Sequence, residues 1–141
     1  AFGGMAGSDP FGPHEGFAGI LLGASACDGH IADEEMQARV TQLTRMKMFS
    51  RYGDKHWEKL MNRLMGLLKK KGVGTLLEKS VEAVPPELAE TVFANACDIV
   101  LGDGTVEDDE KEFLSDLHDQ LGIEKARAQN IVKVMVIKNK G

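Results

Sequence analysis

Three features of the sequence predict an all-α fold. Apolar residues recur three and four positions apart through most of the chain, which is the period of one helix face. β-Branched residues seldom alternate with polar ones, so the pattern of a half-buried strand is nearly absent. Glycine and proline clusters interrupt the helical pattern at several points, where helices are expected to end. A length of 141 residues fits one domain with its own core.

We expect seven helices between these interruptions. Most of them are separated by residues that end a helix or precede one, namely Asp28-Gly29, Gly72 with Gly74, Pro85-Pro86 and Gly122. The expected helices span residues 17–27, 33–51, 54–71, 75–84, 87–101, 107–121 and 123–138. Residues 1–16 are rich in Gly and Pro, and we expect them to be a flexible leader before a single domain at 17–141.

Each of the longer helices carries one apolar stripe, and these stripes predict the core. In the third helix the inward residues are Trp57, Leu60, Met61, Leu64 and Leu68. In the fifth they are Leu88, Val92, Phe93, Ala96 and Val100, in the sixth Phe113, Leu114, Leu117 and Leu121, and in the seventh Ile131, Val134, Met135 and Ile137.

Composition and charge exclude several classes of function. A net charge of −5 argues against a nucleic-acid binder or a membrane-surface protein, and no apolar run approaches the length of a membrane-spanning helix. The charge is divided: residues 45–71 hold nine Lys or Arg and two acids, whereas residues 103–124 hold nine acids and one Lys. Two cysteines without metal-ligand spacing fit a cytoplasmic protein. Catalytic metal, nucleophile and phosphate-loop motifs are missing, so we expect no enzyme.

An acidic turn occurs twice, 75 residues apart. The segments are Asp-Gly-His-Ile-Ala-Asp-Glu-Glu at 28–35 and Asp-Gly-Thr-Val-Glu-Asp-Asp-Glu at 103–110. Each follows an apolar helix and opens an amphipathic one, so we interpret the chain as an internal duplication with halves at about 17–72 and 87–141. Asp-Gly turns and first-turn acids also occur simply because they favour turns and helix starts, but here the acids recur at the same positions.

Helix geometry ranks the acids of these turns. At 100° per residue Glu110 lies along the apolar stripe of its helix, whereas Asp109 lies to its side. Glu35 lies at the edge of its stripe and Glu34 nearly opposite. A turn Asp and a Glu one helical turn later form an oxygen-rich pocket suited to Ca²⁺, Mg²⁺ or Mn²⁺. If one copy alone binds a metal, we expect it to be the second.

Two further residues are weaker ligand candidates. His30 occupies the variable position of the first turn, where its nitrogen would shift the preference towards a transition metal such as Zn²⁺; a lone loop His is more often simply exposed. Asp98 precedes the second turn by less than two helical turns, and pairing within the core is an equal alternative for it. An EF-hand is excluded, because Ala24, Ala26, Ile99 and Leu101 stand where its loop needs oxygen ligands.

The two turns resemble the duplicated signature of the tellurite-resistance TerB-like family. The resemblance covers about residues 17–138 and rests on the Asp-Gly-x-apolar-x-x-acid-Glu pattern in duplicate. It implies a seven-helix domain without enzymatic activity, linked to stress responses and to multiprotein assemblies. It also implies divalent-cation binding by the matching acids, which are Asp28, Glu34, Glu35, Asp103, Asp109 and Glu110. Ala32 departs from the family pattern, which usually has a helix-capping Ser there.

A second class of function stays open beside the metal-binding one. In this alternative the chain is a metal-independent helical module for protein–protein interaction, in which the acids serve helix starts and charge-guided docking. The basic segment 45–71 is then either an ordinary solvated helix face or a docking surface for an acidic partner.

Overall fold

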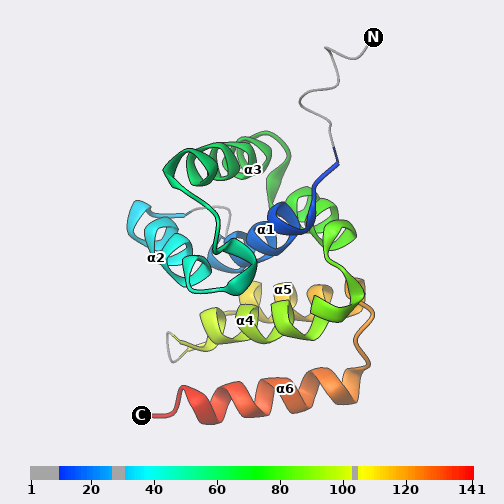
Figure 1. Ribbon diagram of the computed structural model, residues 1–141. Coiled ribbons are helices and arrows are strands. Elements are labelled where there is room, and N and C mark those ends of the chain that lie inside the picture. Colours follow the sequence, from blue (N-terminus) through cyan, green and yellow to red (C-terminus); the bar gives the residue numbers. More distant parts are fainter. Residues whose placement is uncertain (1–9, 27–30, 103–104) are drawn as a thin grey trace.

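The computed structural model describes residues 10–26, 31–102 and 105–141, and every regular element among them is helical. The all-α prediction is therefore confirmed for this part of the chain. Six α-helices are joined by short connections and two 3₁₀ turns (Figure 1). They are α1 (Pro13–Ser25), α2 (Asp33–Thr44), α3 (Asp54–Ala83), α4 (Ala89–Leu101), α5 (Asp108–Gln120) and α6 (Lys125–Lys138), with η2 (Lys47–Phe49) and η3 (Pro86–Leu88).

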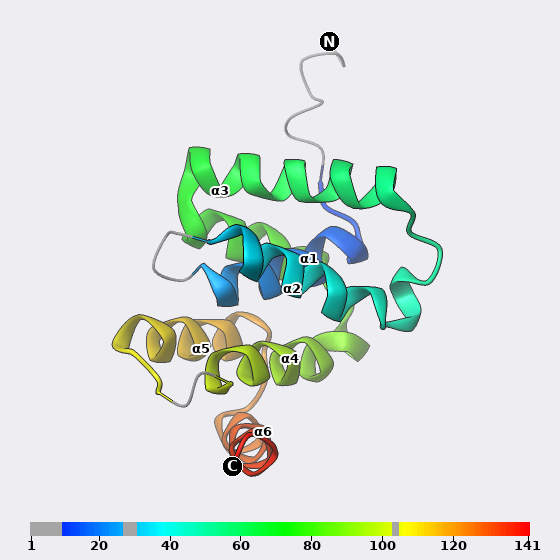
Figure 2. The ribbon, with the colours of Figure 1, turned by 90° about the vertical axis from the view of Figure 1, so that its left-hand side faces the viewer.

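The centre of the domain is α1, which lies between α3 on one side and α4 on the other (Figure 2). Every residue from Gly16 to Ala24 is buried, as expected of a helix that is apolar on all faces. Two glycines allow α3 to approach closely. A Cβ at Gly16 would lie 2.7 Å from the Ser80 carbonyl oxygen, and one at Gly19 would collide with the Ser80 side chain. The small residues of α1 thus determine where α3 packs.

The prediction of seven helices is not confirmed, because residues 54–83 form one element with a sharp break inside it. Gly72 has φ 87° and ψ 172°, outside the helical region and accessible mainly to glycine. The second half of α3 doubles back beneath the first, as Figure 2 shows. The sequence therefore located the interruption, but the chain resumes its helix directly after Gly72 without a separate loop.

Two predicted boundaries are wrong, each for a local reason. Pro13 stands in the first turn of α1, where its fixed φ is favourable, so the predicted leader at 1–16 extends too far. The second helix ends at Thr44 instead of 51, because Met46 is extended and η2 then carries Phe49 into the core. Phe49 stacks on Trp57 with ring centroids 5.0 Å apart, which compensates for the early helix end.

The C-terminal helix α6 forms the outermost layer, packed mainly on α4 (Figure 1). Its predicted stripe is only partly correct. Ile131 and Met135 are half-buried against the core, whereas Val134 and Ile137 are 55% and 71% exposed. Ala128 and Val132 lie on the inner side instead. The period was blurred because apolar residues occur on nearly the whole circumference of α6 between residues 131 and 137.

Other predicted stripes match the buried core. Trp57, Leu60 and Met61 are buried, and so are Leu64 and Leu68. The inner face of α4 is buried through Val92, Phe93, Ala96, Cys97 and Val100. In α5 the core contacts come from Phe113 and Leu117, with Leu114 and Leu121 half-buried. None of the helices in the described segments is both long and apolar enough to cross a bilayer.

Candidate functional site

The two acidic turns lead into α2 and α5, and the structure describes their helical ends. Asp28, His30 and Asp103 lie outside the described residues. Six acids of the first helical turns are described, and we refer to them as the first-turn acids: Asp33, Glu34 and Glu35 in α2, and Asp108, Asp109 and Glu110 in α5.

The backbone enters both helices in the same way. The residue before α2, Ala32, has φ −79° and ψ 155°, and the residue before α5, Glu107, has φ −74° and ψ 162°. One position earlier, Ile31 and Val106 are half-buried and pack on the hydrophobic core. An apolar residue therefore anchors each turn. Because the backbone angles match, the free N–H groups of the first helical turn have equivalent directions in α2 and α5.

At the start of α5 the Glu110 carboxylate stabilises its own helix. Its Oε1 accepts a hydrogen bond from the Glu107 backbone N–H at 2.8 Å, which is one half of a capping box. The side chain is half-buried, as its place along the apolar stripe predicts. One carboxylate oxygen is thus used for the helix start, and the other makes no hydrogen bond to a described residue.

At the start of α2 no such bond is present among the described residues. Ala32 has no side-chain acceptor, and Glu35 is exposed without a hydrogen bond to the Ala32 backbone. Asp33 and Glu34 border a hollow of about 680 Å³ that runs along α2 to Arg45. The first turn is therefore the more open of the two.

Asp109 lies beside two acids that the sequence did not single out. Together with Glu112 and Asp116 it borders a hollow of about 270 Å³ between α5 and the second half of α3, whose apolar wall includes Leu77 and Phe113. The spacing of three and four residues places these carboxylates on one face of α5. The sequence carries this spacing at residues 109, 112 and 116, outside the repeated turn.

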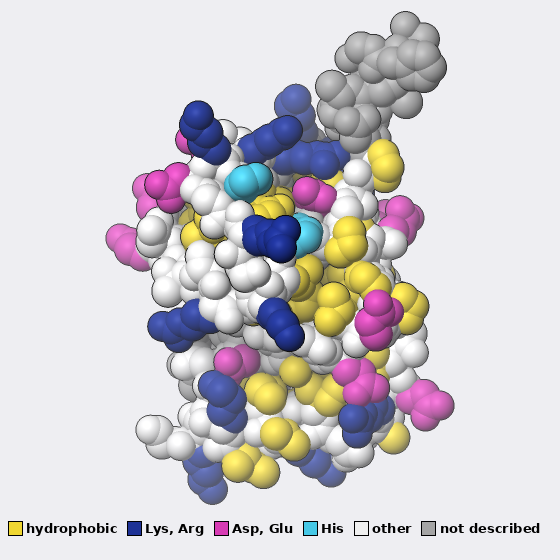
Figure 3. Space-filling model, in the orientation of Figure 1, with side chains coloured by type: hydrophobic (Ala, Val, Ile, Leu, Met, Phe, Trp, Pro, Cys, Tyr) yellow, Lys and Arg dark blue, Asp and Glu magenta, His cyan; other side chains and the backbone are white. Residues whose placement is uncertain are grey.

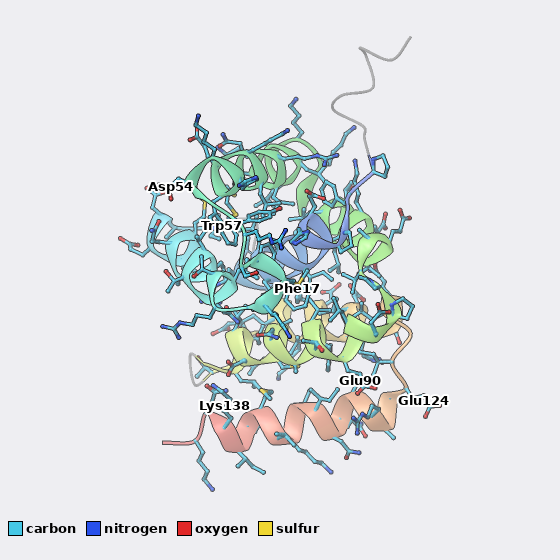
Figure 4. All side chains as sticks on the ribbon, viewed as in Figure 1. Phe17, Asp54, Trp57, Glu90, Glu124 and Lys138 are labelled. Atoms are coloured by element: carbon cyan, nitrogen blue, oxygen red, sulfur yellow. The ribbon has the colours of Figure 1, made fainter. Side chains whose placement is uncertain are left out.

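Asp98 is held by the end of α6. Its Oδ1 accepts hydrogen bonds from Asn139 Nδ2 at 2.8 Å and from Lys138 Nζ at 3.1 Å. A second ion pair joins Arg127 to Glu90 at 2.8 Å, nearer the other end of α6, so that the two pairs connect α4 to α6 at both ends (Figure 4). Asp98 thus pairs with the end of α6 at the surface, and not within the core as its alternative expected.

The first-turn acids take no part in the ion pairs between described residues. Where the chain is described, the ion pairs are Glu90 with Arg127, Asp98 with Lys138 and His118 with Asp119, and none of them involves a first-turn acid. Neither do the described carboxylates, histidines and cysteine form a group of three that would hold a metal ion by themselves. A cation site at either turn would therefore need ligands from residues 27–30 or 103–104.

The surface of the first half of α3 is rich in basic side chains (Figure 3). Lys and Arg side chains gather over the first half of α3, at the top of the view in Figure 3. Arg63 and Lys79 contact Phe11, their charged groups 4.9 Å and 5.0 Å from its ring centroid, so the chain just before α1 lies between two cations.

The thiol nearest the second turn is inert. Cys97 is buried in α4, and burial, reinforced by the charge of Asp98, raises its pKa to about 12. A thiol that stays protonated is a poor nucleophile and a poor metal ligand. Cys97 is therefore a packing residue.

Comparisons of the chain with family models, with curated proteins and with solved structures find no match. The class of protein rests on the geometry alone: a bundle of six helices with two acidic helix starts.

Proposed function

We propose that this chain is a non-enzymatic domain that binds divalent cations at its two acidic turns. One observation carries the proposal. Two helix starts with the same backbone geometry each present three carboxylates, and none of the ion pairs between described residues involves one of them. Like charges held close together favour a bound cation, because it relieves their repulsion.

The ligands we propose come from both sides of each turn. Asp28, Glu34 and Glu35 would serve the first site, and Asp103, Asp109 and Glu110 the second. In support, Glu110 retains one carboxylate oxygen beyond the one bonded to Glu107. Carboxylate ligands favour Ca²⁺, Mg²⁺ or Mn²⁺, and Zn²⁺ becomes competitive at the first turn if His30 participates.

The proposal includes an internal duplication and a cellular role. The equivalent entry angles at Ala32 and Glu107, together with Ile31 and Val106 against the core, support a repeat of helix, acidic turn and helix. By its resemblance to TerB-like proteins, such a domain acts in chemical stress resistance or as a metal-responsive scaffold.

Titration calorimetry with Ca²⁺, Mg²⁺, Mn²⁺ and Zn²⁺ tests the proposal. The wild type is expected to show saturable binding, and the double variant Asp103→Asn/Glu110→Gln is expected to lose the tighter site. Gln at position 110 keeps an oxygen that accepts the bond from Glu107 and removes only the charge. Loss of binding in this variant therefore reports ligation, not a broken helix start.

Glu124→Gln is the matched control, because Glu124 is an exposed acid at the start of α6, away from both turns. It should leave every binding isotherm unchanged. Absence of saturable binding in the wild type, or equal binding by the double variant, contradicts the proposal.

A second function is favoured by a separate observation. The helix α6 carries Val134, Val136 and Ile137, which are the large aliphatic side chains that lie exposed among the described residues. Exposed aliphatic side chains on one helix are typical of a protein–protein contact. A metal-independent interaction module accounts for them, and it predicts a thermal midpoint that does not change with cations or chelator.

A further inference from the structure

A groove opens on the face of the molecule formed by α5 and α6. Both helices pack on α4, and Phe93 of α4 forms the floor. Leu114 lines one wall, and Ala128 with Val132 lines the other. The hollow measures about 540 Å³, and we call it the α5–α6 groove. It is separate from both acidic turns.

The groove continues along α6 beyond the hollow. Val136 lies one helical turn after Val132 on the same side and is 48% exposed, so it prolongs the apolar wall. On α5, Leu114 and His118 are also one turn apart and both face the groove. The apolar floor is therefore an elongated strip between two helices.

The rim of the groove is basic. Lys125 and Lys133 border it on α6, two turns apart, and neither is in an ion pair with any described residue. Lys111 lies on the same face of α5, one turn before Leu114. No Asp or Glu is among the residues that line the groove. In a chain of net charge −5, this is a local excess of positive charge over apolar surface.

We propose that the α5–α6 groove binds an acidic amphipathic helix of a partner protein. A strip of apolar side chains between two helices fits the apolar face of a third, whose side chains at positions i, i+4 and i+7 would enter it. Acids flanking that face would meet Lys125 and Lys133. A membrane surface is disfavoured, because α6 has no Trp, Tyr, Phe or Leu to enter a bilayer.

A second copy of the chain is also disfavoured as the occupant. The described acidic helices, α2 and α5, already pack their apolar sides on their own core. Neither has an apolar face left to enter a groove.

The test uses a fluorescein-labelled peptide of about 16 residues with leucines at helical spacing and glutamates on both flanks. Fluorescence anisotropy should show saturable binding to the full chain. A peptide with lysines in place of the glutamates should not bind, and one with serines in place of the leucines should not bind either.

Two protein variants locate the peptide. Lys125→Glu/Lys133→Glu should weaken binding at least about tenfold, because both charges at the rim are reversed. Val136→Asp should weaken it similarly. The control is Val134→Asp, since Val134 is 55% exposed against 48% for Val136 but lies about 160° around the helix from it. The control should bind within about twofold of the wild type.

Several outcomes overturn the proposal. They are no saturable binding of the acidic peptide, binding that the Lys125→Glu/Lys133→Glu variant retains, and equal losses in Val134→Asp and Val136→Asp. Two more outcomes would show that another occupant uses the groove. Sedimentation with phosphatidylserine vesicles while the peptide fails to bind would indicate a membrane surface, and concentration-dependent dimerisation that the Val136→Asp variant abolishes would indicate a second copy of the chain. Metal-free buffer keeps this test independent of cation binding at the acidic turns.

Discussion

The starts of α2 and α5 are alike in backbone and different in side-chain bonding. Both follow an extended residue, and both are anchored by one half-buried aliphatic side chain. Between described residues, the first turn of α5 is closed by a side-chain hydrogen bond, from the Glu107 N–H to Glu110, and that of α2 is not. At α2 the residue before the helix is Ala32, whose side chain has no acceptor for the free backbone N–H groups of the first turn.

This difference distinguishes two possible roles of a first-turn acid, which are stabilising the helix start and binding a cation. Glu110 is half-buried and bonded, so it contributes to stability without any ligand. Glu35 is exposed and makes no side-chain hydrogen bond to a described residue. No contact with a described residue therefore explains why a glutamate stands at this position. Substitutions can therefore distinguish the structural acid from the acids whose role requires a cation.

The largest expected effect concerns the helix that leads into the first turn. Gly16→Ala should destabilise the domain by more than about 2 kcal/mol, because the new Cβ would meet the Ser80 carbonyl oxygen and Ala83. Urea denaturation followed by circular dichroism measures it. Gly66→Ala is the control: nothing lies within 4 Å of its Cβ, so it should be neutral or stabilise by up to about 1 kcal/mol. Equal losses in both variants would show that α1 is not closely packed on α3.

The next effect concerns the helix that leads into the second turn. Asp98→Ala should cost about 1 to 2 kcal/mol, because it removes the acceptor of Asn139 and Lys138 and frees the end of α6. Hydrogen exchange should accelerate for the amides of residues 135–140 more than for those of α2. Asp119→Ala, at an exposed site next to His118, should change stability much less.

A direct comparison of the two turns uses the same substitution in each. Glu110→Ala should destabilise by about 1 kcal/mol in metal-free buffer, because the Glu107 N–H loses its acceptor. Glu35→Ala should lie within about 0.3 kcal/mol of the wild type, as an exposed acid without a hydrogen bond. Equal losses at the two sites would contradict the asymmetry between the turns.

The smallest effect is a dependence on alkaline pH near the second turn. Burial raises the pKa of Cys97 to about 12 from its ordinary 9.0, so the thiol ionises first in the unfolded chain. The contribution of the protonated Cys97 thiol to the free energy of unfolding is complete below pH 9 and is lost as the pH rises towards 12. At pH 9.5 the wild type should lose stability relative to Cys97→Ala, by less than about 1 kcal/mol. Parallel pH profiles for the two proteins would show that Cys97 is accessible to water.

The sequence was sufficient for the fold class and for most of the core. The stripes through Trp57, Leu64, Phe93 and Leu117 predicted burial correctly, because one face of each helix is much more apolar than the other. The stripe of α6 failed where apolar residues surround the helix, so that periodicity does not define a face. The predicted end of α2 was wrong because the stack of Phe49 on Trp57 determines where the helix ends. This contact joins two segments of the chain, and the helical period of one segment does not report it.

For the candidate sites the sequence was less complete. It identified the asymmetry between Glu110 and Glu35 from facing angles alone, and the structure adds the bond to Glu107 that explains it. It did not find the α5–α6 groove, because that surface arises from the separation of two helices across Phe93. No spacing within a single helix encodes such a separation.

Paramagnetic broadening by Mn²⁺ tests the central claim most directly. In a ¹H–¹⁵N spectrum of the wild type, a low ratio of Mn²⁺ to protein should broaden amides around residues 103–110 first and those around 28–35 second. Glu110→Gln should abolish the first set while leaving the second, and Glu35→Gln should do the reverse. Broadening spread evenly over the acidic surface, or unchanged in both variants, would contradict a cation site at either turn.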